Sequence, residues 1–131
     1  MEDGCGIYRE EKSMQATLDC IRELKQRYAQ AGIEDASKQY NTELLYFLEL
    51  GCGLDIAEAT CMGALQRRES RGAHQRLDEG CTERNDEQFL KHSLVYYQGG
   101  ADARLEWQDV DVSLLPPGVR AYGEAGKGEQ A

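Results

Sequence analysis

This 131-residue chain lacks several features that would indicate a membrane, nucleic-acid or dinucleotide-binding protein. No apolar run approaches the roughly 20 residues that a membrane-spanning helix needs. The 24 acidic side chains outnumber the 15 basic ones and give a formal net charge of −9, which opposes phosphate backbones and anionic lipids. No GxGxxG pattern is present, and neither Gly4-Cys5-Gly6 nor Gly51-Cys52-Gly53 can replace it. We therefore expect this segment to bind neither nucleic acid nor a dinucleotide cofactor.

The cysteines and histidines form no recognisable site. The five cysteines are separated by 15, 32, 9 and 20 positions; they are Cys5, Cys20, Cys52, Cys61 and Cys81. This odd, irregular set fits neither a disulfide framework nor a CxxC zinc site, and it favours reduced thiols in the cytoplasm. His74 and His92, even with Cys81, fall short of the four closely spaced ligands of a structural zinc site. We predict no metal site and no catalytic residue.

The first clear element is an amphipathic helix. The composition, 40% hydrophobic and 30% charged, fits one globular domain with a modest core. Side chains for one apolar face recur at three- and four-residue steps, and they are Met14, Leu18, Ile21, Leu24 or Lys25, and Tyr28. This spacing predicts a helix from about Glu11 to Ala31, ended by Gly32.

A second, longer helix is predicted from an N-cap at Asn41 to about Ser70. It carries two apolar stripes. The first stripe is Leu45, Leu48, Cys52, Ile56 and Ala59, and the second stripe is Phe47, Leu50, Leu54, Ala57, Cys61 and Leu65. A helix that is apolar on so much of its circumference is normally buried by more than one neighbour. Either the C-terminal segment covers the second stripe, or the stripe packs on a partner that this segment does not supply, which would leave Ile56 facing the core.

The sequence of the C-terminal third predicts a short helix followed by a β-hairpin. Residues 87–93 can form a short helix, and residues 93–98 and 104–110 form the strands of a hairpin around residues 99–102. Leu105 and Trp107 would share one face of that hairpin. Pro116-Pro117 should end regular structure, and residues 118–131, rich in glycine and charge, should form a mobile tail.

A dense run of mixed charge lies between the second helix and the hairpin. Arginine pairs bidentately with carboxylates, so this density favours an ion-pair network that docks one polar surface on another. The predicted docking residues are Arg68, Glu69, Ser70, Arg71, His74, Arg76 and Arg84. The alternative is a solvated loop whose basic bias reflects the dipole at the end of the preceding helix.

Four motifs, in this order, carry a family resemblance. They are Glu2-Asp3-Gly4-Cys5-Gly6-Ile7-Tyr8-Arg9, Asn41-Thr42-Glu43-Leu44-Leu45 with Glu49-Leu50-Gly51, Glu69-Ser70-Arg71-Gly72 with Gln75-Arg76-Leu77-Asp78-Glu79-Gly80-Cys81-Thr82-Glu83-Arg84, and Leu114-Leu115-Pro116-Pro117. Together they resemble the C-terminal domain of the fumarate reductase flavoprotein subunit, and more loosely that of succinate dehydrogenase and L-aspartate oxidase. The stretch from Gln75 to Arg84 is the part most similar to the fumarate reductase branch.

The resemblance implies that the intact protein is an oxidoreductase subunit with covalently bound FAD that interconverts fumarate and succinate in anaerobic electron transport. Its implied partners are the upstream flavin-binding domain, an iron–sulfur subunit and membrane anchor subunits, at the cytoplasmic face of the inner membrane. In that family the residues that hold flavin and substrate lie upstream. This segment would therefore be a non-catalytic fragment without a cofactor of its own, bracing the flavin-binding domain.

The expected fold is mainly α: two long antiparallel helices of an incomplete, spectrin-repeat-like three-helix bundle, then a short helix and a small β-hairpin. Residues 1–9 would be the remnant of an upstream helix, 10–92 the helical domain, 93–117 the hairpin and its extension, and 118–131 the tail. A free-standing helical module that binds a partner helix is the alternative function. A cysteine-based redox regulator is the third.

Overall fold

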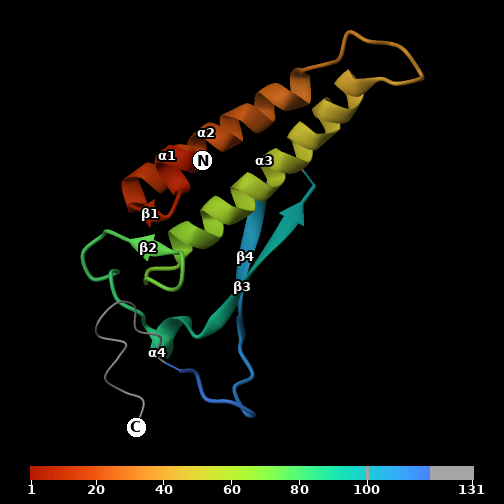
Figure 1. Cartoon of the computed structure of the whole chain (residues 1–131). Helices are drawn as coiled ribbons and strands as arrows, with labels where there is room; N and C mark the ends of the chain where they lie inside the picture. The colour runs from red at the N-terminus through yellow and green to blue at the C-terminus, as the bar shows by residue number, and fades with distance from the viewer. Residues whose placement is uncertain (100, 119–131) are drawn as a thin grey trace.

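Two long helices dominate the molecule. A computed structural model describes residues 1–99 and 101–118. Helix α2 (Glu11–Gln30) and helix α3 (Thr42–Gln66) run antiparallel, and the loop that joins them lies at one end of the molecule (Figure 1). The Asn41 side chain accepts a hydrogen bond from the Leu44 N–H at 2.8 Å, which confirms the predicted N-cap. Both long helices are thus confirmed, and α2 ends within a residue of its predicted limit.

The core lies between α2 and α3, near the C-terminal end of α3. Met14, Leu18 and Ile21 present one face of α2 because they are four and three residues apart. This face packs against Cys61 and Ala64 of α3. At the other end of the pair, Tyr28 stacks on Phe47 with ring centroids 4.4 Å apart, and a Cβ at Gly51 would come within 2.5 Å of the Tyr28 hydroxyl. Glycine at position 51 therefore makes room for this ring.

The two apolar stripes of α3 are used the opposite way round from the prediction. In the second stripe, Leu54 is 9% exposed, Cys61 is fully buried and Phe47 stacks on α2, although Leu50 is 55% exposed. Ile56 of the first stripe is 67% exposed. The expectation that Ile56 faces the core is wrong, because α2 packs on much of the second stripe. That an upstream helix covers the rest of this stripe stays a prediction.

The N-terminal segment is folded against the helix pair. Helix α1 (Glu2–Cys5) packs on α2 so closely that a Cβ at Gly4 would meet Thr17 Oγ1 at 1.9 Å. Strand β1 (Tyr8–Arg9) then pairs in parallel with strand β2 (Gln75–Arg76). That residues 1–9 are the remnant of a longer upstream helix stays a prediction.

Helix α3 ends at Gln66, four residues before the predicted Ser70. The backbone of Arg67 is extended, and the Ser70 N–H bonds to the Glu83 carbonyl instead of continuing the helix. The last carbonyls of α3 accept hydrogen bonds from the buried guanidinium of Arg76. Tertiary hydrogen bonds therefore set this helix end, and a reading of helical periodicity overshoots it.

The hairpin follows a single helical turn and starts earlier than predicted. Helix α4 (Asp86–Phe89) is capped by Asn85, and it is shorter than the predicted 87–93 because the chain enters strand β3 (Lys91–Gln98) at once. Strand β4 (Ala101–Asp109) pairs antiparallel with β3, with Gln98 opposite Ala101, so the connection is shorter than residues 99–102. The hairpin lies against α3 (Figure 1).

The predicted mobile tail, 118–131, lies outside the described residues except for Gly118. Within the described part of the chain, no helix is both long enough and apolar enough to span a bilayer. The helical share and the small sheets match the predicted mainly α class, whereas the comparison with a spectrin-like bundle stays a prediction.

Candidate functional site

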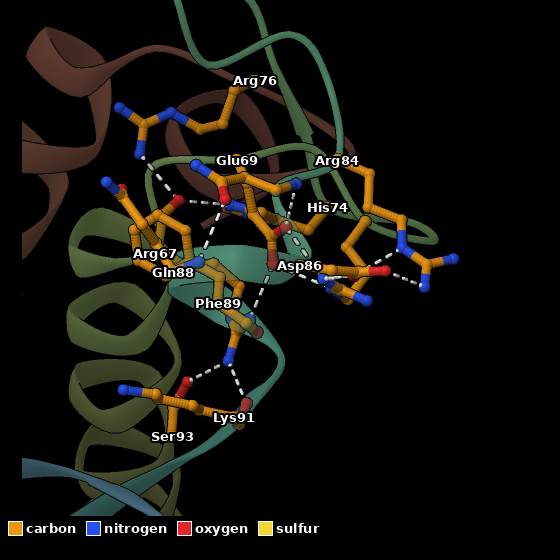
Figure 2. Close-up of polar contacts among 12 residues, drawn as sticks. Arg67, Glu69, His74, Arg76, Arg84, Asp86, Gln88, Phe89, Lys91 and Ser93 are labelled. Atoms are coloured by element: carbon orange, nitrogen blue, oxygen red, sulfur yellow. Dashed lines mark hydrogen bonds and ion pairs between the residues drawn. The ribbon is translucent and has the colours of Figure 1, made fainter. Parts of the chain in front are cut away.

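Glu69 is the centre of a buried ion-pair network at the C-terminal end of α3. Its carboxylate is 0% exposed and accepts a hydrogen bond from Arg67 Nη1 at 2.7 Å (Figure 2). It also accepts from Arg71 Nε at 2.8 Å and from Arg71 Nη2 at 3.0 Å. The Asn85 backbone N–H adds a fourth at 2.8 Å. Burial alone would raise the pKa of Glu69, but the hydrogen bonds from Arg71, Asn85 and Arg67 outweigh it and hold the pKa below 4.5.

Arg67 joins this network to the hairpin. Its Nη1 also donates to the Phe89 carbonyl at 2.7 Å, and its Nη2 donates to the Lys91 carbonyl at 2.6 Å and to Ser93 Oγ at 2.9 Å (Figure 2). The guanidinium lies 5.0 Å from the centroid of the Trp107 ring, within cation–π range. One side chain thus fixes α4 and β3 to the end of α3.

Arg76 caps α3 from inside the protein. The residue is 2% exposed, and its Nη1 donates to the carbonyls of Ala64 at 3.2 Å, Leu65 at 3.3 Å and Arg67 at 3.3 Å. Its Nε donates to Asp78 Oδ2 at 2.6 Å. A cation at a helix C-terminus is favoured by the helix dipole, and here it also satisfies carbonyls that no helical N–H can reach.

His74 connects the network to the N-terminal segment. Its Nε2 lies 2.9 Å from the Arg67 carbonyl, and its Nδ1 lies 2.7 Å from Arg9 Nη1. A carbonyl only accepts and a guanidinium only donates, so Nε2 carries the proton and Nδ1 accepts. Burial lowers the pKa of His74 below 6.5, and the nearby charges of Arg9, Arg76 and Arg67 lower it further, so the ring is held neutral.

The remaining members tie down the loop between β2 and α4. Ser70 Oγ donates to the Cys81 carbonyl at 3.0 Å and accepts from the Arg76 N–H at 2.9 Å. Asp86 accepts from Arg84 and from Arg71 Nη2, and these two guanidinium groups lower its pKa from 3.8 to about 2, with Arg84 the larger influence. The loop is therefore held by both neutral and charged hydrogen bonds.

The structure brings six of the seven predicted docking residues into this network: Glu69, Ser70, Arg71, His74, Arg76 and Arg84. The seventh, Arg68, has a side chain that is 57% exposed and lies 3.3 Å from Glu11. Four of the six are less than a tenth exposed, so what they bind first is this chain itself. Docking of these residues onto another domain stays a prediction.

The predicted docking set omitted five members of the network: Arg67, Asp78 and Asp86, which lie in the same charged run, and Arg9 and Asn85. Arg9 lies 65 positions from His74, and no spacing rule connects them. Asn85 has a local signal, because Asn followed by acidic residues is typical of a helix N-terminus. A search for caps inside the charged run would have found it.

The described residues offer no cradle for FAD. Their parallel strand pairing is β1 with β2, two residues in each strand, and no glycine-rich turn leads from it into a helix as dinucleotide binding requires. Nor do three or more His, Cys, Asp or Glu side chains in the described ranges converge as metal ligands.

An apolar face of α3 forms a second candidate surface, which we call the outer face. It consists of the exposed members of the first stripe, Leu45, Leu48, Cys52 and Ile56, of which the three larger side chains are 52%, 55% and 67% exposed. They recur at three- and four-residue steps and so lie along one side of α3. A row of exposed apolar side chains along one side of a helix is typical of an interaction site.

Comparison with known proteins decides which family this architecture represents. The model of the fumarate reductase flavoprotein C-terminal family matches residues 1–122. The chain belongs to that family. The fumarate reductase flavoprotein subunits of a Serratia species and of Escherichia coli K12 are 54% and 53% identical to it over 123 residues. The succinate dehydrogenase flavoprotein subunit of Coxiella burnetii is 38% identical over 122 residues, so the predicted resemblance to both branches is confirmed.

A solved structure shows that the family likeness extends to the fold. An Escherichia coli quinol fumarate reductase FrdA variant superposes with a TM-score of 0.89 at 53% identity, over 95% of this chain and 21% of that one. A quinol-fumarate reductase solved with menaquinol gives a TM-score of 0.85. The Serratia and Escherichia coli matches cover 94% of this chain, which spans about a fifth of those relatives' own length, 21% and 20%.

Proposed function

We propose that this chain is the C-terminal, non-catalytic portion of the FAD-containing subunit of quinol:fumarate reductase, and that it braces the flavin-binding domain of that subunit. The observation that carries the proposal is the family match over residues 1–122, together with the TM-score of 0.89 to the Escherichia coli protein. In the intact protein the activity is the interconversion of fumarate and succinate. The flavin would be covalently attached outside this segment.

The partners follow from the same assignment. They are the flavin-binding domain upstream, an iron–sulfur subunit and membrane anchor subunits, with the assembly at the cytoplasmic face of the inner membrane. Residues 1–9 would continue an upstream helix, residues 10–92 would form the brace, and residues 93–117 the hairpin and its extension. The remainder, 118–131, would be a tail.

Two features of the structure suit a brace. The buried network around Glu69 fixes α3, α4, the hairpin and the N-terminal segment to one another. A displacement of one of these elements would therefore displace the others. The outer face of α3 supplies apolar area that a neighbouring domain can cover. Arg68, which is exposed beside this rigid region, is the predicted docking residue best placed to reach outward.

A chimeric subunit tests the proposal. The corresponding C-terminal fifth of the Escherichia coli flavoprotein subunit would be replaced by this chain, and the purified protein assayed for covalently bound FAD and fumarate reduction. We expect flavin content and turnover close to those of the parent. In the same chimera, Leu48→Glu should reduce flavin retention because it places a charge on the outer face.

The control is a matched substitution away from that face. Leu114 is 93% exposed, so Leu114→Glu makes the same chemical change without touching α3 and should leave flavin retention unchanged. A chimera that folds but carries no flavin would contradict the bracing role. It would favour the alternative function, a helical module that binds a separate partner.

A further inference from the structure

Tyr40 combines an unusual backbone conformation with an exposed aromatic ring. It lies in the loop between α2 and α3, at the opposite end of the helix pair from β2 (Figure 1). Among the described residues it is the one residue other than glycine with a positive φ, 54°, and it is 98% exposed. A bulky residue is strained in this left-handed region, because its Cβ crowds the backbone. A ring this exposed makes almost no contact within the chain that could offset the strain.

Hydrogen bonds across the loop hold Tyr40 in this conformation. The side-chain amide of Asn41 donates to the Asp35 carbonyl at 2.7 Å and to the Ser37 carbonyl at 3.1 Å. The Glu43 carboxylate accepts a hydrogen bond from the Asp35 N–H at 2.7 Å. A strained residue persists where the surrounding structure fixes its conformation, and such residues are concentrated at functional sites. The loop therefore presents the Tyr40 ring in a fixed position instead of letting it relax onto the protein.

The position of Tyr40 beside the cap of α3 makes its exposure more unusual. Asn41 is the N-cap, and an apolar residue directly before an N-cap often packs on the fourth residue of the helix. That fourth residue is Leu45, which is 52% exposed. Contact with Leu45 would cover part of the Tyr40 ring, so a ring that is 98% exposed does not make it. Leu45 is also the first member of the outer face, and Tyr40 therefore extends that surface past the N-terminal end of α3.

We propose that Tyr40 is the anchor residue with which this segment docks on the flavin-binding domain: its ring enters an apolar pocket of that domain, and its hydroxyl forms a hydrogen bond inside the pocket. This inference rests on the proposed function, which supplies the flavin-binding domain as the occupant. The chain spans about a fifth of the length of its relatives, 21% and 20%, so in a subunit of that length most residues lie outside this segment. They are the nearest source of a pocket because they belong to the same polypeptide.

A fixed, exposed tyrosine has the properties of an interface anchor. Tyrosine is enriched among the few residues that contribute most of the binding energy of an interface, and these residues fill pockets in the partner. Its ring buries a large apolar area while its hydroxyl keeps a hydrogen-bond partner. The side chain has few rotatable bonds, and the loop already fixes the backbone of Tyr40, so docking orders little that is not ordered beforehand. The backbone strain is thus the cost of holding the ring ready for its partner.

Substitutions at Tyr40 separate docking from folding. Glycine suits a left-handed backbone, so Tyr40→Gly in the full chain should melt at the same temperature or a few degrees higher. The same substitution in the Escherichia coli chimera should lower the fraction of subunits that retain flavin, whereas Tyr40→Phe keeps the ring and should retain most of it. Gln39→Ala truncates the neighbouring exposed residue and should change neither property. Flavin retention by Tyr40→Gly equal to that of a flavin-loaded chimera would overturn the inference and leave the proposed function standing.

Tyrosine nitration gives a second readout that does not depend on flavin. Tetranitromethane should modify Tyr40 readily in the dilute full chain, and this modification should be lost in the chimera. Tyr46 lies in the same tryptic peptide, so tandem mass spectrometry assigns the modified ring. Equal nitration of Tyr40 in the chain and in the chimera would overturn the inference, with or without bound flavin. Protection of Tyr40 in the concentrated chain alone would also overturn it, because the occupant would then be a second copy. Protection in a chimera without flavin would support docking and contradict only the bracing role.

Discussion

The two ends of α3 are stabilised in opposite ways. At its C-terminal end, buried charge dominates: Arg76 binds the last carbonyls and Glu69 accepts four hydrogen bonds. Toward its N-terminal end, Leu45 and Leu48 are more than half exposed. These charged residues at the C-terminal end of α3 are therefore buried rather than solvated. The two apolar residues toward its N-terminal end are exposed rather than part of the core. The polar end pairs most of its buried groups within this chain, although Arg76 Nη2 makes no hydrogen bond to the described residues and lies 4.0 Å from Glu11 Oε2. The apolar end offers area to a neighbour.

Removal of Glu69 should break the polar end and produce the largest effect. Glu69→Ala leaves Arg67 and Arg71 without their shared carboxylate inside the protein, which typically costs about 3–5 kcal/mol. Urea unfolding followed by circular dichroism measures the loss. Glu79→Ala is the matched control, because Glu79 is exposed and should change the stability by less than about 0.5 kcal/mol. Equal effects of the two substitutions would mean that the network contributes nothing to folding.

Truncation of Met14 should weaken the apolar contact between α2 and α3, and we expect a smaller loss of stability than for Glu69→Ala. Met14 is 0% exposed between α2 and α3, so Met14→Ala removes buried methylene groups and leaves a cavity, at a cost of about 3 kcal/mol. The same urea titration measures it. Ala16 of α2 is exposed, and Ala16→Gly, a change at a site without core contacts, should cost only about 1 kcal/mol through helix propensity. A smaller loss at Met14 than at Ala16 would contradict the assigned core.

The sequence predicts the two long helices better than the contacts between elements, for physical reasons. Helical periodicity places α2 and α3 well because the Met14, Leu18 and Ile21 face is a local pattern. It cannot say which stripe of α3 meets α2, because both stripes have the same spacing and only tertiary packing chooses between them. Charge density indicates a network around Glu69, but the contact of Arg9 with His74 depends on the parallel pairing of β1 and β2.

Lowering the pH should reduce the stability of the folded protein, because His74 at the C-terminal end of α3 becomes protonated. The folded protein holds this ring neutral with a pKa below 6.5, whereas the unfolded chain takes up the proton near 6.5. Stability is therefore full above that pH and falls as the pH drops from 6.5 to the folded pKa, by at most about 1.4 kcal/mol per pH unit. His74→Gln should remove this part of the profile. His92, an exposed residue on β3, provides the control, since His92→Gln should leave the slope intact; an unchanged slope in the His74 variant would contradict the assignment.

Charge on the outer face should have the smallest effect on folding and a clear effect on association. Because Ile56 is 67% exposed, Ile56→Glu removes no core contact and should change the free energy of unfolding by less than about 0.5 kcal/mol. Exposed apolar patches of roughly 300–600 Å² favour contact between molecules, so the unmodified chain should bind hydrophobic dyes and self-associate, and Ile56→Glu should reduce both. Light scattering and dye fluorescence measure these changes.

The comparison variant is Leu54→Glu on the opposite side of α3. Leu54 is 9% exposed beside α2, so a carboxylate there is desolvated without a partner and should cost several kcal/mol, on the order of 2–5. Dye binding should then increase because the helix pair opens. If Ile56→Glu unfolded the chain while Leu54→Glu left it stable, the second stripe would be the free one after all, and α2 would not be its partner. A compact monomer that binds no dye would show instead that the outer face is too small to recruit a neighbour.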